Sequence, residues 1–152
     1  MGDWAGDGGV RIGHVHLKVA DLERAIGFYH GVLGFEVRQR YGRQAAFLAA
    51  GGYHHHVGLN TWESYGGTPP PPGTTGLYHV AFLYPTRGAL AEAVRRVLAA
   101  GIRLDGASDH GVSEAVYLRA SRKPQLVALD FRAQMAGNTT ARNRVLELVR
   151  RY

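Results

Sequence analysis

The first clear pattern in the chain is a short segment, starting at residue 12, in which hydrophobic and polar residues alternate. This is the pattern of a strand with one buried face. In residues 12–19 apolar side chains alternate with His14 and His16, so the predicted strand carries two imidazoles on its polar face. Residues 22–33 then place apolar side chains at helical spacing, and Gly34 is expected to end that helix. Three more predicted strands follow, at residues 35–41, 45–50 and 53–60.

The same order of elements returns in the second half of the chain. A connector rich in glycine and proline, residues 61–75, can form neither a helix nor a central strand. A strand at residues 77–84 and a helix at residues 87–100 follow it, and Gly101 stops this helix as Gly34 stops the first. The remaining predicted strands are residues 102–104, 114–119 and 126–131. The repeat predicts an α+β fold of paired βαβββ units that form an open eight-stranded cup with helices outside.

A chain of 152 residues is about one domain. We expect a flexible lead at residues 1–9 and a single domain at residues 10–133. Its two units would be residues 10–60 and 76–133, on either side of the connector. The basic tail, residues 134–152, is expected to form a short amphipathic helix that packs on the body or on a neighbouring chain, so a homodimer is one outcome we consider.

Three consecutive histidines stand directly before an alternating apolar run in the strand predicted at residues 53–60. Strand parity puts His54, His56 and Asn60 on the polar face. It favours His56 as the inward residue, with His55 as the alternative if the strand is bulged. Imidazoles serve as acids, bases and metal ligands near neutral pH, so this run is a candidate site. The nearby Trp62 could hold a planar ligand, or could simply pack under a loop.

Composition excludes several classes of protein. There are no cysteines, which rules out disulfides and thiolate metal sites and suits a cytoplasmic location. No apolar run is long enough for a membrane span, so no membrane partner is expected. The net charge of +6 favours a small acidic or anionic ligand. The basic residues form no stripe with interleaved aromatics, which argues against nucleic acid.

Several runs of residues are similar to a known family. The opening run HVHLKVADLER at residues 14–24, followed by FY at 28–29 and VLGF at 32–35, resembles the start of the vicinal oxygen chelate superfamily. That superfamily includes glyoxalase I, extradiol dioxygenases and the fosfomycin and bleomycin resistance proteins. The runs HHHVGLNTW at residues 54–62 and GLYHVA at 76–81 resemble its catechol 2,3-dioxygenase branch most closely.

The resemblance implies roles for particular residues. It places metal ligands at His14 and His79, and a divalent ion, Fe(II) or Mn(II), as the cofactor. It gives one of His55 and His56 the part of an acid and base. The implied partner is a small aromatic or anionic substrate. The resemblance counts His110 and Tyr117 among the catalytic residues, as side chains that contact the substrate oxygens. From their positions in the pattern, His16, His54, Asn60 and Trp62 are the candidate substrate-binding residues.

The sequence departs from the family where the third metal ligand is expected. The family has a glutamate there, and alignment without gaps places Val127 at that position. Valine cannot bind a metal, so the set of two histidines and one carboxylate typical of non-haem Fe(II) is incomplete. His56 could take the vacant place, Glu114 or Asp130 could reach it, or no metal is bound.

Three functions therefore remain open. The first is a metal-dependent extradiol dioxygenase that cleaves the ring of a catechol-like substrate. The second is an isomerase or lyase of the glyoxalase type. The third is a metal-free protein that binds a small molecule, as resistance proteins of this superfamily do.

Overall fold

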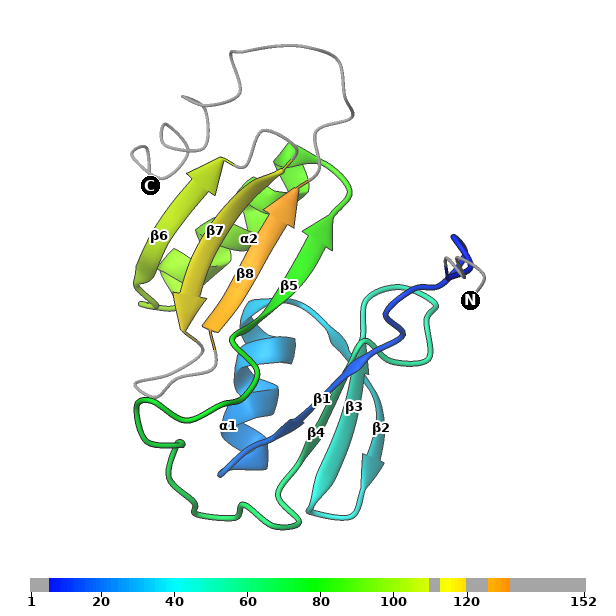
Figure 1. Ribbon diagram of the computed structural model, residues 1–152, viewed down its shortest axis with the longest axis vertical. Helices are drawn as coiled ribbons and strands as arrows, with labels where there is room; N and C mark the ends of the chain where they lie inside the picture. The colour runs from blue at the N-terminus through cyan, green and yellow to red at the C-terminus, as the bar shows by residue number, and fades with distance from the viewer. Residues whose placement is uncertain (1–5, 110–112, 120–125, 132–152) are drawn as a thin grey trace, which may run out of the picture.

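The computed structural model describes residues 6–109, 113–119 and 126–131. The first unit begins with a strand and two short helical segments and ends with three strands (Figure 1). Its elements are β1 (Val15–Lys18), α1 (Leu22–Ile26), η1 (Gly27–Val32), β2 (Glu36–Tyr41), β3 (Ala45–Ala49) and β4 (Val57–Asn60). The second unit repeats this order. Its elements are β5 (His79–Tyr84), α2 (Arg87–Ala99), β6 (Leu104–Asp109), β7 (Glu114–Arg119) and β8 (Leu126–Phe131).

Each unit forms one four-stranded sheet, and the two sheets have the same topology. The strand orders are β1-β4-β3-β2 and β5-β8-β7-β6. In each sheet the first strand of the unit pairs in parallel with the last, and the other pairs are antiparallel. The predicted fold of paired βαβββ units is therefore confirmed.

The helical region of each unit, α1 with η1 in the first and α2 in the second, begins at a side-chain cap and is followed by a glycine. The Asp21 carboxylate accepts from the amide of Arg24, and the Thr86 hydroxyl accepts from the amide of Ala89. The helix predicted at residues 22–33 has the expected extent but changes type, because η1 is a π-helix, in which each amide bonds five residues back. Gly34 and Gly101 follow the helices with φ angles of 82° and 72°, which favour glycine.

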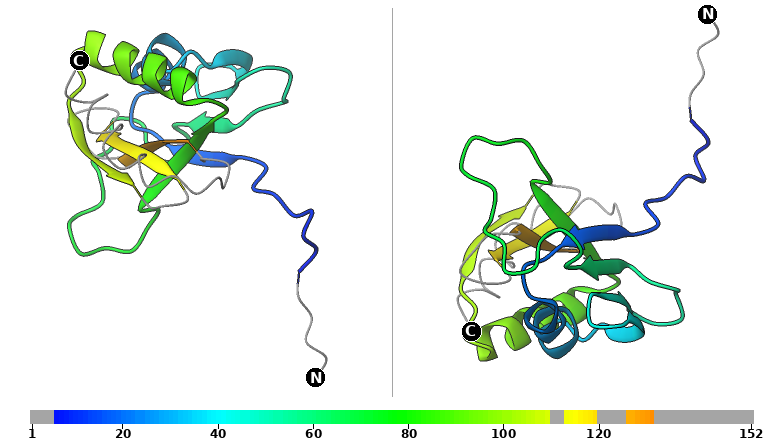
Figure 2. Two further views of the ribbon diagram at one scale, coloured as in Figure 1. Left: turned by 90° about the horizontal axis from the view of Figure 1, so that it is seen from above. Right: turned by 90° about the horizontal axis from the view of Figure 1, so that it is seen from below.

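The helices of both units lie on one side of the sheets, and the connector loops out on the other (Figure 2). One continuous hydrophobic core fills the space between helices and sheets. The units meet at an aromatic seam, where the ring of Phe82 lies 5.0 Å from that of Phe35 and 6.1 Å from that of Tyr29, centroid to centroid. Arg96 of α2 also donates to the carbonyl of Gly31 at 3.1 Å. The two units are therefore packed as one body.

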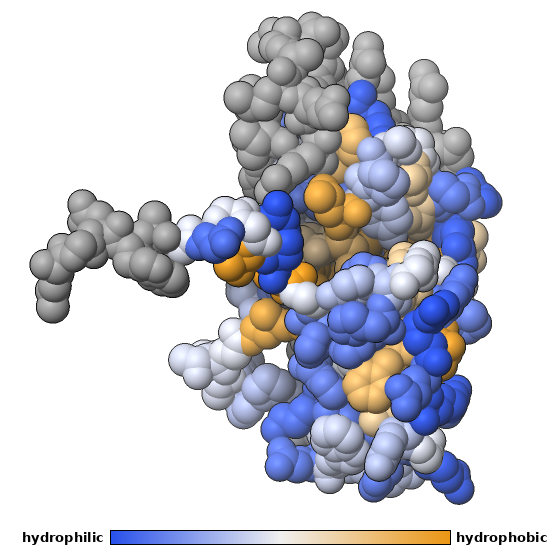
Figure 3. Space-filling model, turned by 90° about the vertical axis from the view of Figure 1, so that its right-hand side faces the viewer, coloured by the Kyte–Doolittle hydropathy of each residue, from blue (hydrophilic) through white to orange (hydrophobic). Residues whose placement is uncertain are grey.

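The face of the molecule drawn in Figure 3 is mostly polar. Figure 3 shows one face on which hydrophobic residues form small areas separated by hydrophilic ones. Within the described residues, no helix combines the length and the apolar composition needed to cross a membrane. The predicted tail, residues 134–152, lies outside the described part of the chain.

Two boundaries differ from the prediction in a way that affects the site. The strand expected at residues 53–60 starts only at Val57, because residues 51–54 form turns and bends that begin with Gly51 at a φ of 63°. In the second unit β6 extends to Asp109, five residues beyond the predicted end of that strand. The histidine run therefore precedes a strand instead of lying within it.

Candidate functional site

The face of the first sheet that points away from the helices carries most of the predicted site. Leu17 of β1 and Val57 of β4 belong to the hydrophobic core, so the alternate residues of these strands point the other way. His14 and His16 are both exposed on that side. The ring of Phe47, from β3, lies 5.9 Å from that of His16, centroid to centroid. The first sheet thus presents imidazoles beside an aromatic ring.

His54 and His55 from the loop before β4 join His14 in an imidazole cluster. The ring of His55 lies 4.5 Å from that of His14, and the ring of His54 lies 6.5 Å from it. The Nδ1 atoms of His54 and His55 are 2.7 Å apart, so one of them donates a hydrogen bond to the other. Burial lowers the pKa of His55, and the neighbouring charges of His14 and His54 lower it further. His55 is therefore held as a neutral imidazole at neutral pH.

His56 lies elsewhere, which differs from the expectation based on strand parity. Its ring contacts those of Tyr53 at 4.7 Å and Phe35 at 6.1 Å, and its Nδ1 accepts from the amide of Ala50 at 3.3 Å. Burial lowers its pKa, and the charge of His54 adds to the effect. Parity failed because His56 precedes the first residue of β4. His55 is thus the histidine that contacts His14, and the acid-base role of either residue stays a prediction.

His16 is held by a polar residue from the neighbouring strand. The side-chain amide of Asn60 lies 2.9 Å from Nε2 of His16, and Trp62 lies beside the same imidazole with 5.8 Å between ring centroids. Gly58 leaves the space that the His16 ring occupies, because a Cβ there would stand 2.9 Å from Nδ1. The predicted substrate residues His16, Asn60 and Trp62 are therefore in contact with one another.

His79 lies on the second sheet among different neighbours. Its ring is 6.1 Å from that of Tyr117 and 5.7 Å from that of Tyr78. Its Nδ1 atom is buried and has no hydrogen-bond partner in the described part of the chain. The rings of His14 and His79 are not in contact with each other. Their predicted sharing of one metal stays a prediction.

Val127 faces the core and not the side of His79. It is completely buried, pairs with Val80, and both side chains belong to the core cluster. His79 and Tyr117 alternate with core residues and so lie on the opposite face, where Ala128 is the partner of Tyr117. A glutamate at position 127 would therefore be buried in the core. The face of His79 is reached in β8 by the residues that alternate with Val127, among them Ala128 and Asp130.

The two carboxylates considered as substitutes have other surroundings. Glu114 is 1% exposed and forms a double ion pair with Arg87, so its oxygens are already engaged. Asp130 has one buried oxygen that finds no hydrogen-bond partner among the described residues. It lies four residues along the sheet from His79, because Asp130 pairs with Leu83 and His79 pairs with Leu126. Within the described residues no group of three histidines or carboxylates is placed to hold a metal ion. His110 lies outside those residues.

Two residues of this site were not singled out by the sequence pattern. Phe47 lies between Ala46 and Leu48, which are both core residues, so the alternation of β3 could have placed it on the histidine face. A glycine within a strand often marks a close approach by another group, and Gly58 is such a case. Neither signal names a ligand by itself.

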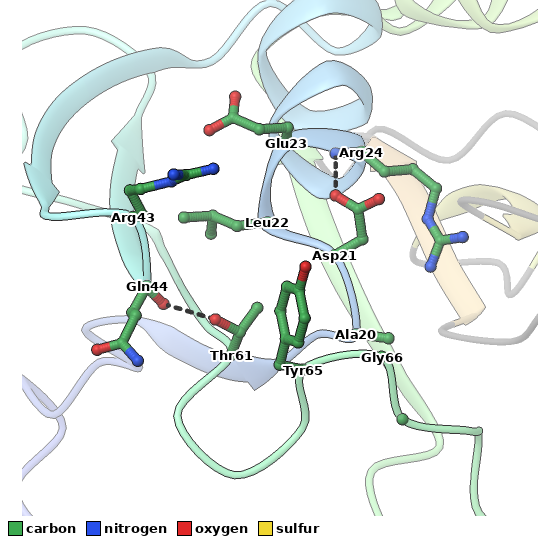
Figure 4. A pocket seen from close by; sticks show the side chains of 11 residues that line it. Ala20, Asp21, Leu22, Glu23, Arg24, Arg43, Gln44, Thr61, Tyr65 and Gly66 are labelled. Carbon is green, nitrogen blue, oxygen red and sulfur yellow. Dashed lines mark hydrogen bonds between the residues drawn. The ribbon is translucent and has the colours of Figure 1, made fainter.

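A hollow lies at the far end of β1, away from the imidazoles (Figure 4). Its walls include Asp21, Arg43 and Tyr65, from the start of α1, the turn between β2 and β3, and the loop after β4. The Asp21 carboxylate is engaged there in capping α1. None of the residues predicted to act on a substrate lines this hollow.

Comparison with known proteins identifies the family. Residues 11–126 match the Glyoxalase/Bleomycin resistance protein/Dioxygenase superfamily. The chain belongs to this superfamily. A solved glyoxalase/dioxygenase of the superfamily from Nostoc punctiforme has the same fold, with a TM-score of 0.67 and 17% identity over 88% of this chain and 99% of that one. The resemblance stated from the sequence is thereby confirmed.

Two curated relatives in the superfamily are dioxygenases. The chain is 42% identical over 95 residues to the catechol-2,3-dioxygenase of Bacillus subtilis, which is 62% of this chain and 33% of the relative. It is 33% identical over 110 residues to the biphenyl-2,3-diol 1,2-dioxygenase 3 of Rhodococcus globerulus, which is 72% of this chain and 57% of the relative. The chain thus spans between a third and somewhat over half of these relatives.

Proposed function

We propose that this chain acts as a ring-cleaving dioxygenase on a catechol-like substrate. One observation carries the proposal: the imidazoles of His14, His16 and His55 gather with the ring of Phe47 on one exposed sheet face. The chain that carries this face is 42% identical over 95 residues to a catechol-2,3-dioxygenase.

The residues of this face suit a planar, electron-rich substrate. The rings of Phe47 and Trp62 flank His16 and offer apolar surface to a flat ring. The imidazoles supply hydrogen bonds to adjacent hydroxyl oxygens. His55 can accept a proton from a substrate hydroxyl because its lowered pKa keeps it neutral at neutral pH. The net charge of +6 attracts the phenolate that results.

A divalent ion, Fe(II) or Mn(II), would supply the activation of dioxygen when it is bound. We propose that His14 and His79 hold it. His14 directly precedes β1 and His79 is the first residue of β5, the corresponding strand of the second unit, and imidazole nitrogen is a suitable donor. The unpartnered Nδ1 atom of His79 is available for such a bond. With Val127 in the core, the described residues fit this ion in donor type. In β8 the carboxylate on the face of His79 is Asp130, which pairs with Leu83, four residues along β5 from His79.

The test is oxygen consumption by the purified chain after anaerobic addition of Fe(II). Catechol and 2,3-dihydroxybiphenyl are the substrates, and the coloured ring-cleavage product is followed by absorbance. His55→Gln should reduce turnover roughly 100-fold, a typical loss for a general base. His30→Gln is the matched control, since His30 bonds the carbonyl of Phe35 near the end of η1 and touches none of the site residues. Turnover of the methylglyoxal–glutathione adduct without oxygen uptake would contradict the proposal.

The second candidate is a metal-free binding protein, favoured because position 127, where the family has its glutamate ligand, is a valine buried in the core. It predicts that 4-nitrocatechol binds to metal-free protein and that added Fe(II) changes neither binding nor turnover. His14→Ala and His79→Ala separate the candidates. Both substitutions should lower the affinity for Fe(II) if the dioxygenase proposal holds. Neither should change the affinity for Fe(II) if the chain is a metal-free binding protein.

A further inference from the structure

The side chain of Asn60 is 6% exposed and lies between two polar groups. Its Oδ1 atom accepts from the backbone amide of Trp62 at 3.3 Å. Its Nδ2 atom lies 2.9 Å from Nε2 of His16. The backbone amide can only donate, so the atom of Asn60 that faces Trp62 is the carbonyl oxygen. The atom that faces His16 is therefore the amide nitrogen.

This arrangement fixes the tautomer of His16. The amide nitrogen of Asn60 is a donor only, so Nε2 of His16 must accept and carry no proton. In the neutral imidazole the proton then resides on Nδ1. No described residue accepts a hydrogen bond from that Nδ1 atom. The ring is exposed on the face with Phe47, so the Nδ1 proton is offered to whatever binds there.

Gly58 is the second part of this arrangement. It is the register partner of His16 between the parallel strands β1 and β4, and the imidazole lies over it. A Cβ at position 58 would stand 2.9 Å from Nδ1, 3.0 Å from Cγ and 3.1 Å from Cε1 of His16. These distances are too short for an unmoved ring, so any other residue at position 58 displaces His16 from Asn60.

We propose that Asn60 and Gly58 are positioning residues that hold His16 as the Nδ1-protonated tautomer, so that His16 donates a hydrogen bond to an anionic oxygen of the bound substrate. This inference rests on the proposed function for the identity of the ligand, a phenolate oxygen of a catechol. The tautomer itself is independent of the reaction. Asn60 acts through His16 and does not touch the substrate.

The tautomer is measured by ¹⁵N NMR of the full, metal-free chain with labelled histidines. At about pH 8.5, two units above the ordinary pKa of imidazole, nitrogen shifts report which ring nitrogen bears the proton. His30 is an internal reference, because its Nδ1 atom lies 2.6 Å from the carbonyl oxygen of Phe35 and must be the donor. His16, assigned by comparison with His16→Gln, should show the same Nδ1-protonated pattern. An Nε2-protonated His16 would overturn the proposal.

Two variants test the cause. In Asn60→Asp the carboxylate can only accept, so His16 should change to the Nε2-protonated form, while His30 stays unchanged. Gly58→Ala should displace the ring and leave a mixture of tautomers. Its control is Gly106→Ala, another glycine within a strand, where an added Cβ meets nothing within 4 Å. If Asn60→Asp leaves the His16 tautomer as it was, Asn60 does not set it.

A titration with 4-nitrocatechol tests whether the Nδ1–H group of His16 donates to a bound ligand, because this compound has a phenolate oxygen at this pH. Its affinity should fall about tenfold in Asn60→Asp and in Gly58→Ala, as expected for one lost hydrogen bond to a charged group. Gly106→Ala should bind as the unaltered chain does. Equal affinity in all variants would overturn this inference alone. No binding by the unaltered chain after anaerobic addition of Fe(II) would overturn the proposed function and, with it, the assigned ligand.

Discussion

The two units share one order of elements but differ in what they carry. Six of the eight histidines lie in residues 10–60, and four of them contact one another or Phe47 on the exposed face of the first sheet. The corresponding face of the second sheet has His79 and Tyr117 beside alanines. The first unit is thus rich in groups that bind and transfer protons.

The second unit is distinguished by how its helix is anchored. Arg87, the first residue of α2, forms a double ion pair with the buried Glu114 at the start of β7. The first unit has a similar pair between Arg40 and Glu23, but both side chains are largely exposed. A repeated fold therefore leaves each copy able to specialise, because the pattern that builds the sheet uses only one face of each strand.

The largest effect expected is on the buried ion pair. Arg87→Leu leaves the Glu114 carboxylate, 1% exposed, without its cation, which should lower the free energy of unfolding by about 3–5 kcal/mol. Arg40→Leu removes the exposed pair with Glu23 in the first unit and should hardly move the unfolding midpoint, because that pair is solvated. Urea unfolding of both variants measures the difference.

The double variant Arg87→Leu/Glu114→Leu controls for lost packing. It should regain much of the stability, since neither charge is then left unpaired. If Arg87→Leu and Arg40→Leu destabilise equally, burial does not distinguish the two units.

A smaller effect is expected at the glycines that end the helices. Both Gly34 and Gly101 have positive φ, so replacement by alanine should cost roughly 1 kcal/mol at each. Gly34→Ala should cost more, because its Cβ would stand 2.5 Å from Nη1 of Arg96 and disturb the bond to Gly31. Thermal unfolding of the two variants measures the difference between their losses of stability. Equal losses would show that the guanidinium moves aside freely.

The smallest expected effect is a loss of stability on acidification, which should be confined to the first unit. The pKa values of His55 and His56 are lowered, mainly by burial, so the unfolded chain takes up protons at a higher pH than the folded chain. Stability is therefore full above about pH 6.5 and falls as the pH drops towards the lowered pKa values. Hydrogen exchange at pH 7.5 and 5.5 should show β4 losing protection before β8.

His56→Gln should reduce this dependence on pH, and His30→Gln serves as the control for loss of an imidazole. Equal loss of protection in both sheets on acidification would mean that the histidine cluster does not set the acid response.

The sequence pattern predicted the order of elements because each strand buries one face, which leaves a period of two in the chain. It also located Gly34 and Gly101, since positive φ selects glycine. It could not show that the helix widens at Gly27 into η1, because π-helical bonding leaves no distinct period in so short a segment.

The site was predicted in part. The placement of His14, His16, Asn60 and Trp62 follows from the sequence because they alternate with core residues or adjoin a strand, and their roles stay predictions. The orientations of His55 and His56 were not, since the alternation holds only inside β4. The face of Val127 was also missed, because alignment with a family cannot fix the register against β5 when the sequence before β8 differs from the family. The pairing of Arg87 with Glu114 joins distant residues and leaves no local signal.

The parallel pairing of the first and last strand in each unit has a consequence for synthesis of the chain. β1 cannot take its place beside β4 until the intervening helix and strands have been made, and β5 must likewise wait for β8. During translation the first unit can therefore close while the second is still incomplete. Its side of the aromatic seam, with Tyr29 and Phe35, would then remain uncovered until Phe82 arrives. A ribosome that stalls within the second unit would thus present a nascent chain with an apolar surface for chaperones to bind.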